Sequence, residues 1–281
     1  MHKKKPWIWF AVVFAATLAC GMPGFSAPLP VDTLDSNSLS TVVAETANAA
    51  GLETAAAATN TPLPSPTEIP TSTATATPTP PISSEGTSLS KQSDGSYLFT
   101  DHQGGYSVNI PPGWLAIRIN QQEFINVWTL PIASDPKIQK FLSQVQNFDP
   151  KIYRLIGIDA DANDLQTGYI ANLLITWHRN DTMTIAQDIA QAKTDLPKSS
   201  RGLKVTYADV GYTSTNIPVG IVETSQSGTT LSGQNVSVYQ KVLVLKLKSG
   251  SLSFTLSTVS QLRDGFVPGF DVMTDQIKML P

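Results

Sequence analysis

Histidine and serine side chains carry much of the acyl-transfer chemistry of proteins, and this chain of 281 residues holds only three histidines. Two of them, His102 and His178, lie in the second two thirds of the chain, and no Gly-x-Ser-x-Gly motif presents a nucleophilic serine. We expect both histidines to be exposed in loops and the protein not to be an enzyme. The alternative is an extracytoplasmic hydrolase or transferase whose catalytic residues the sequence does not reveal.

Oxygen ligands for a metal could come from an acidic run, Asp159–Asp164, which alternates carboxylates as the first half of a calcium loop does. Its sixth position is Asp164 where the turn needs glycine, and its twelfth is Ile170 where a bidentate glutamate is required. The single cysteine excludes a cysteine-rich zinc or iron–sulfur site. We therefore expect an acidic turn at 159–164, no metal site and no cofactor.

The only cysteine, Cys20, lies where a lipid could be attached. It directly follows an apolar run over 7–18, which is preceded by three lysines at 3–5. This order resembles the signal and lipobox of bacterial lipoproteins, in which the cysteine is acylated and becomes the first residue of the mature chain. The apolar run is too short for a permanent membrane span. We expect a signal peptide over 1–19 and lipid on Cys20; the alternative is a secreted protein cleaved after Ala27.

A low-complexity region follows the cysteine. Residues 59–84 are mostly Thr, Ser, Pro and Ala, and their seven prolines favour an extended backbone over a helix. We expect residues 20–90 to be a disordered tether and 91–281 to be one globular domain. The chain has a formal net charge of −3, and from residue 91 onward 16 basic residues balance 16 acidic ones. The domain therefore lacks the basic surface that nucleic-acid binding requires.

Apolar periodicity predicts the elements of the domain. A helix should begin at Asp135-Pro136, and a second should begin at a capping box of Thr184 and Gln187 and end at Pro197. A third should carry Phe270, Met273, Ile277 and Leu280 on one face. The predicted strands are 97–99, 106–110, 114–119, 152–158, 169–177, 203–210, 217–224, 236–247 and 252–256. This order predicts class α+β, an antiparallel sheet with helices packed on it, in which 236–247 is central and apolar on both faces.

One motif resembles a known family. Phe99-Thr100-Asp101, followed by Tyr106–Trp114 (YSVNIPPGW), is similar to the opening hairpin of PsbP-like domains. The resemblance implies an α/β/α sandwich over residues 97–281 and a role in binding or assembly. Together with Cys20 it predicts a lipoprotein on the extracytoplasmic face of the cell membrane. Its partners would be the membrane, through the lipid, and an envelope protein or polymer, with no nucleic acid.

Two further groups of residues could bind ligands or be modified. Trp114, Trp128 and Trp177 could line a groove, but such tryptophans are more often part of a core, and that is our expectation. Asn180 and Asn235 begin glycosylation sequons, which we expect to be idle in a bacterial lipoprotein. The sequence identifies no binding residue.

Overall fold

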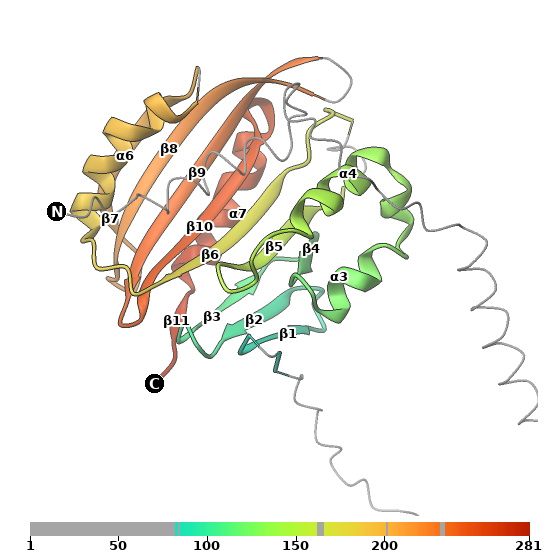
Figure 1. The fold of residues 1–281 in the computed structure, drawn as a ribbon, viewed down its shortest axis with the longest axis horizontal. Coiled ribbons are helices and arrows are strands. Elements are labelled where there is room, and N and C mark those ends of the chain that lie inside the picture. The colour runs from blue at the N-terminus through green and yellow to red at the C-terminus, as the bar shows by residue number, and fades with distance from the viewer. Residues whose placement is uncertain (1–81, 84, 162–165, 201, 231–233) are drawn as a thin grey trace, which may run out of the picture. The chain divides into compact units, whose positions relative to one another are not determined.

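The computed structural model describes residues 82–83, 85–161, 166–200, 202–230 and 234–281 (Figure 1). The predicted signal peptide, Cys20, Ala27 and nearly all of the predicted tether lie outside these residues. No helix within the described ranges is both long enough and apolar enough to cross a membrane.

The described strands form two antiparallel sheets, where the sequence predicted one. The smaller sheet has the order β1-β2-β3-β11, and its members are β1 (Thr87–Lys91), β2 (Tyr97–Asp101), β3 (Tyr106–Ile110) and β11 (Lys278–Met279). Strand β1 was not predicted, and it begins before residue 91, where we expected the globular domain to start. Its short sequence does not itself indicate a strand; the segment becomes one because it pairs with β2, with Leu89 opposite Phe99. Within the described residues, regular structure therefore begins at Thr87.

The larger sheet has seven strands in the order β4-β5-β6-β10-β9-β8-β7. They are β4 (Trp114–Ile117), β5 (Tyr153–Asp159), β6 (Asn172–Arg179), β7 (Lys204–Tyr212), β8 (Pro218–Thr229), β9 (Asn235–Leu247) and β10 (Gly250–Val259). All of them pair antiparallel to their neighbours. The predicted central strand is β9, which lies between β10 and β8 and is confirmed as apolar on both faces.

Some of the helices in the described residues were predicted and others were not. They are α3 (Gln122–Val127), η1 (Pro131–Ser134), α4 (Pro136–Val145), α6 (Ile185–Ser199), η2 (Ser260–Leu262) and α7 (Arg263–Asp275). Helices α4 and α6 begin at their predicted caps, whereas α3, η1 and η2 were not predicted. Asp135 caps α4 by accepting from the backbone of Lys137, and the predicted capping box of α6 is present. Pro197 lies inside α6 instead of ending it. Helix α7 stops at Asp275, so the predicted continuation through Leu280 is wrong and the chain turns into β11 instead.

These elements stack in layers, which confirms class α+β (Figure 1). Helix α7 and the smaller sheet cover one face of the larger sheet, around a core that includes Phe99, Phe254 and Phe270. On the other face, α4 and α6 pack over separate apolar clusters. Between those two clusters, β10 presents buried hydroxyl side chains, namely Ser251, Ser253, Thr255 and Ser257.

Candidate functional site

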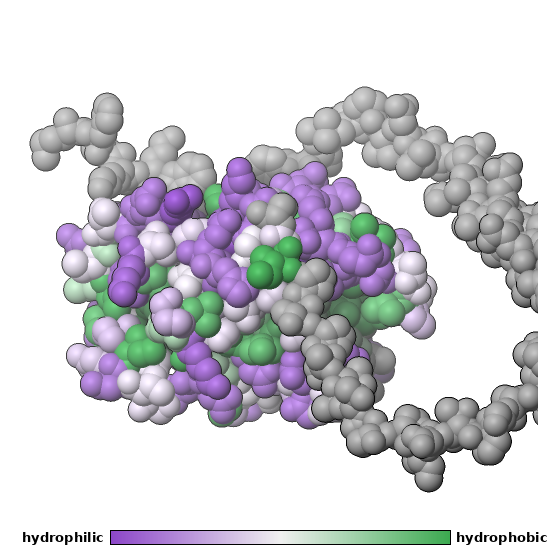
Figure 2. All heavy atoms as spheres, turned by 90° about the horizontal axis from the view of Figure 1, so that it is seen from below, coloured by the Kyte–Doolittle hydropathy of each residue, from purple (hydrophilic) through white to green (hydrophobic). Residues whose placement is uncertain are grey.

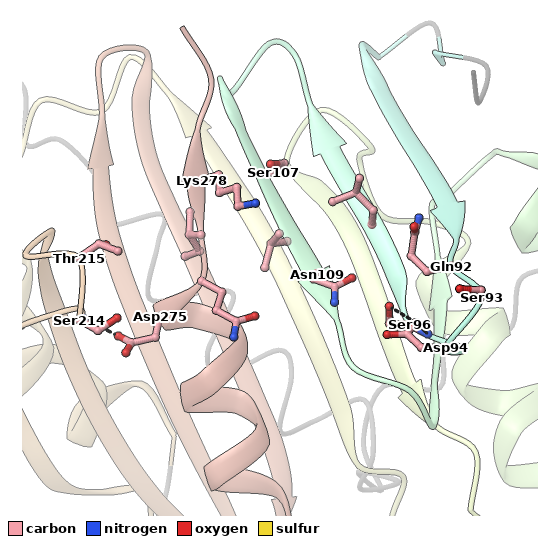
Figure 3. Close-up of a pocket in the computed structure, with 14 residues that line it drawn as sticks. Gln92, Ser93, Asp94, Ser96, Ser107, Asn109, Ser214, Thr215, Asp275 and Lys278 are labelled. Carbon is pink, nitrogen blue, oxygen red and sulfur yellow. Dashed lines mark hydrogen bonds between the residues drawn. The ribbon is translucent and has the colours of Figure 1, made fainter. Parts of the chain in front are cut away.

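A polar pocket of 720 Å³ lies where the smaller sheet meets the loop after β7 and the end of α7 (Figure 3). We call it the polar pocket. Its lining comes from the β1–β2 turn, from β2, β3 and β11, and from the segments around Ser214 and Asp275. The lining residues are Gln92, Ser93, Asp94, Ser96, Leu98, Ser107, Val108, Asn109, Ser214, Thr215, Asp275, Gln276, Ile277 and Lys278.

The turn that leads into β2 holds one carboxylate at the pocket. Asp94 accepts hydrogen bonds from the Ser96 hydroxyl at 2.7 Å and from the Ser96 backbone N–H at 2.9 Å. The hydrogen bond from the Ser96 side chain, together with the backbone N–H of Ser96, lowers the pKa of Asp94. Asp94 is therefore a fixed anionic acceptor at neutral pH.

A second carboxylate lies on the opposite side of the pocket (Figure 3). Asp275, at the end of α7, accepts from the backbone N–H of Ser214 at 2.8 Å, and so holds the loop after β7 against the helix. Lys278 brings an ammonium group from β11, where it pairs with Ser107 of β3. The pocket therefore combines two carboxylates and one ammonium with hydroxyl and amide groups, which can donate and accept hydrogen bonds around an uncharged polar ligand.

A cluster of charged and polar side chains lies outside the polar pocket, beside the turn between β9 and β10. The Lys246 ammonium is 2.9 Å from Asp181 Oδ2, 2.6 Å from Asp188 Oδ2 and 2.6 Å from Ser251 Oγ. Ser251 also donates to Asp181. Because these groups come from β9, β10, the segment after β6 and α6, the cluster fastens the start of α6 to the larger sheet.

The two carboxylates of this cluster have pKa values shifted in opposite directions. Burial opposes ionisation of Asp181, but hydrogen bonds from Ser251, the backbone N–H of Met183 and Lys246 outweigh it and lower its pKa. Burial raises the pKa of Asp188. Lys246 contacts Asp181 and Asp188, and Ser251, whose side chain is buried, donates to Asp181, so these polar groups are engaged with one another.

The two histidines occupy different environments. His102 is exposed in the turn after β2, as predicted, and its backbone N–H donates to Gly86 at 2.9 Å. The prediction of a loop position for His178 is wrong, because it lies within β6, half-buried and directly opposite Ser251 of β10. Burial lowers the pKa of His178, so the imidazole is neutral at physiological pH.

The acidic run is only partly within the described residues, because 162–165 lie outside them. Asp159 ends β5, is buried, and accepts from the backbone N–H of Asp161 at 3.2 Å. Across the described ranges, no group of three or more His, Cys, Asp or Glu side chains is placed to hold a metal ion.

Two of the three tryptophans are packed and one is exposed. Trp177 is buried with the Arg154 guanidinium 5.3 Å from its ring, and Trp114 packs edge-on against Phe266 at 5.6 Å. Trp128 instead follows α3 and is exposed, so its assignment to the core is wrong. Asn180 and Asn235, which begin the sequons, are both exposed.

Sequence reasoning missed the polar pocket. Its lining comes from three stretches, 92–109, 214–215 and 275–278, that are distant in the chain, and none of them forms a motif. The only local signal is the alternation in β3, which directs Ser107 and Asn109 away from the core residues of that strand.

The sequence matches no protein-family model and no curated protein. Among solved structures, the chain is similar to CyanoP, the cyanobacterial PsbP of Synechocystis sp. PCC 6803, with a TM-score of 0.44 and 14% identity over 67% of this chain and 94% of that one. It is similar to LpqN, involved in cell envelope biogenesis of Mycobacterium tuberculosis, with a TM-score of 0.37 and 11% identity over 69% and 91% of the two chains. A mutant of the protein Mog1 gives a TM-score of 0.38 and 7% identity over 66% and 96%.

Proposed function

We propose that this protein is a non-catalytic binding module of the cell envelope, attached to the membrane by lipid on Cys20, whose polar pocket holds a neutral glycan of an envelope polymer. The observation that carries the proposal is the lining of the polar pocket, in which hydroxyl and amide side chains outnumber charged ones.

The chemistry of the lining suits sugar hydroxyls. Each hydroxyl of a sugar both donates and accepts, and the side-chain amides of Asn109 and Gln276 offer a donor and an acceptor each. Asp94 and Asp275 accept from hydroxyl donors. An uncharged ligand is favoured because residues 91–281 hold equal numbers of basic and acidic side chains, and so have no excess of either charge with which to attract a polyelectrolyte.

Membrane attachment is supported by the amino-acid sequence. Three lysines, an apolar run and Cys20 follow one another, and the Thr/Pro/Ala-rich residues after them suit a spacer between membrane and domain. A lipid anchor would keep the polar pocket near the envelope polymer and so raise its effective concentration. A secreted form, cleaved after Ala27, is the alternative.

Binding is favoured over catalysis by what the pocket contains. The side chains that line it include no histidine and no cysteine, and the serine–lysine cluster at Lys246 lies elsewhere and is already occupied by ion pairs. A hydrolase or transferase activity is the competing class, and turnover of an envelope polymer by the purified chain would establish it.

The test is calorimetric titration of the purified protein with soluble, uncharged glycan fragments, namely N-acetylglucosamine oligomers without stem peptides. Removing one hydrogen-bonding side chain, as in Asn109→Ala or Asp275→Ala, should weaken binding by about three- to tenfold. Asn147→Ala, an exposed asparagine outside the pocket, is the matched control and should leave affinity unchanged. Added sodium chloride should have little effect. No heat with the fragments, or equal affinity for all three variants, would overturn the assignment.

A further inference from the structure

Three large apolar side chains are exposed within six residues on and just after α3. Ile125 is 59% exposed, Trp128 40% and Leu130 39%. We call these three residues the α3 patch. Figure 2 views the domain from below Figure 1, the side on which β1 and α3 lie, and apolar side chains there interrupt the polar surface. Exposed apolar side chains that gather in one place mark a surface that meets another apolar phase.

The α3 patch is held rigidly by the side chains beneath it. Phe124 and Val127 point into the core under α4, and the ring of Trp128 packs edge-on against Phe124 at 6.4 Å. The Trp128 side chain is therefore preorganised, and little of its freedom is lost when it is covered.

The surroundings of the α3 patch are almost uncharged. Between Ile119 and Ser134 the sequence holds one charged residue, Glu123, and Glu123 forms an ion pair with the buried guanidinium of Arg118. The other exposed polar side chains on α3 and after it, up to Ser134, are amides and hydroxyls, those of Gln122, Asn126, Thr129 and Ser134. Tryptophan beside neutral hydrogen-bonding groups is the composition that proteins place at the headgroup level of a bilayer.

A second group of exposed apolar side chains, on β7, lies among charged residues. Tyr207, Val210 and Tyr212 share β7 with the charged residues Lys204 and Asp209, and the Asp209 carboxylate accepts from the backbone N–H of Val210 at 2.8 Å. Charges on an edge strand discourage contact with an apolar partner. The α3 patch has no such protection.

The position of the α3 patch indicates which apolar phase it meets. Arg118, which pairs with Glu123 of α3, also donates to the backbone carbonyl of Thr87 at 2.7 Å. Thr87 is the first residue of β1, and the chain before it leads back to Cys20. The α3 patch therefore lies beside the point at which the chain from the lipid attachment site enters the domain, and Figure 1 shows α3 next to β1.

We propose that the α3 patch inserts between the headgroups of the membrane to which Cys20 attaches the chain. The inference rests on the lipid attachment in the proposed function. Such contact fixes the orientation of the domain on the membrane, which lipid attachment alone would leave free. Because its surroundings are neutral, the α3 patch needs no anionic lipid.

The test uses the full lipid-bearing chain reconstituted into phosphatidylcholine vesicles. Acylated Cys20 is the only native cysteine, so Ile125→Cys introduces a single reactive thiol for an environment-sensitive fluorophore. Val272→Cys is the matched control, since Val272 is 57% exposed on α7. Both positions are exposed, so both variants should fold, which their circular dichroism and melting temperature check.

The label at 125 should be quenched by lipids with brominated acyl chains, and iodide should quench it about threefold less than the label at 272. Equal quenching by iodide at the two positions, with no effect of brominated lipid at 125, would overturn the proposal. Lipid attachment is read separately from the mass of the reconstituted chain. If that mass lacks the lipid, the proposed attachment at Cys20 is wrong. The same quenching ratio is then measured on the two labelled variants with the added substitution Cys20→Ala, mixed with vesicles. That ratio still decides whether the α3 patch enters the bilayer.

Discussion

Asp101 and Arg154 form a two-point ion pair that no solvent reaches. Arg154 Nε lies 2.7 Å from Asp101 Oδ2 and its Nη2 lies 3.0 Å from Oδ1, and both side chains have no exposed surface. The guanidinium also donates to the carbonyls of Pro150 and Glu85. Since Asp101 ends β2 and Arg154 lies in β5, this pair fastens the smaller sheet to the larger one.

Breaking the pair from one side should be costly. Asp101→Asn keeps the shape of the side chain but leaves the guanidinium of Arg154 without its counter-charge, and we expect a loss of about 3–5 kcal/mol in the free energy of unfolding. Asp101→Asn combined with Arg154→Met removes both charges and should recover part of that loss. Urea denaturation at neutral pH measures both variants. A loss under about 1 kcal/mol for Asp101→Asn would show that the pair is not a structural link.

The capping box of α6 makes a local contribution to stability. Thr184 accepts from the backbone N–H of Gln187, and the Gln187 side chain accepts from the backbone N–H of Thr184. Thr184→Ala removes the first of these bonds and should lower the free energy of unfolding by about 1 kcal/mol. Thr194→Ala, in the exposed middle of α6, is the control; alanine has the higher helix propensity, so that variant should be neutral or slightly stabilising. Equal effects in thermal melts would refute the capping role.

Two glycines allow the energetic cost of backbone strain to be compared with the cost of a steric clash. Gly105 has a φ of +76° and open space where a β-carbon would lie, whereas Gly250 has a φ of +145° and a β-carbon there would lie 2.1 Å from the carbonyl oxygen of His178. Gly105→Ala should cost about 1 kcal/mol through strain alone. Gly250→Ala should cost about 3 kcal/mol or more, since the strand β6 must also move. Chemical denaturation of the two variants under the same conditions gives the comparison, and equal losses would contradict it.

His178 should make the stability of the domain depend on pH. Burial lowers the pKa of its imidazole in the folded state, so the unfolded chain binds the proton more readily. The contribution of His178 is therefore fully present above its unfolded pKa and is lost as pH falls through the lower folded pKa. The wild type should lose stability more steeply than His178→Gln between neutral pH and mild acid, in urea titrations at a series of pH values.

Asp188 should make the stability of the domain depend on pH in the opposite direction, so it serves as the control for His178. Burial raises the pKa of its carboxyl in the folded state, so its contribution is fully present below the unfolded pKa and is lost as pH rises through the folded one. Asp188→Asn should therefore steepen the loss of stability in acid. Parallel pH profiles for wild type and both variants would mean that neither group changes its proton affinity on folding.

Elements whose information is local could be predicted from the sequence. The stripe of Ile138, Phe141, Leu142 and Val145 predicts α4, and all four residues are buried. The caps at Asp135 and Thr184 depend on neighbours within three residues, and both are present. Alternation in β3 and β10 similarly reports which side chains face the core.

Elements that depend on distant partners could not be predicted. Helix α3 has six residues and no repeating apolar stripe, so only its packing under α4 makes it helical. The division into two sheets depends on β3 and β4 parting after Ile110 and on β11 pairing with β3, and no local pattern encodes either. The polar pocket is missed for the same reason, since its two carboxylates, Asp94 and Asp275, are brought together only by the complete fold.

The pairing of β11 with β3 also sets an order of events during synthesis. Lys278 and Met279 lie opposite Ser107 and Tyr106, so β3 gains this neighbour only after all seven strands of the larger sheet have been synthesised. Until then the edge of β3 is open and the polar pocket lacks one wall, because Ile277 and Lys278 are missing. A ribosome-bound or truncated chain that stops before β11 is therefore unable to assemble the pocket, and the binding that we propose requires synthesis through Lys278.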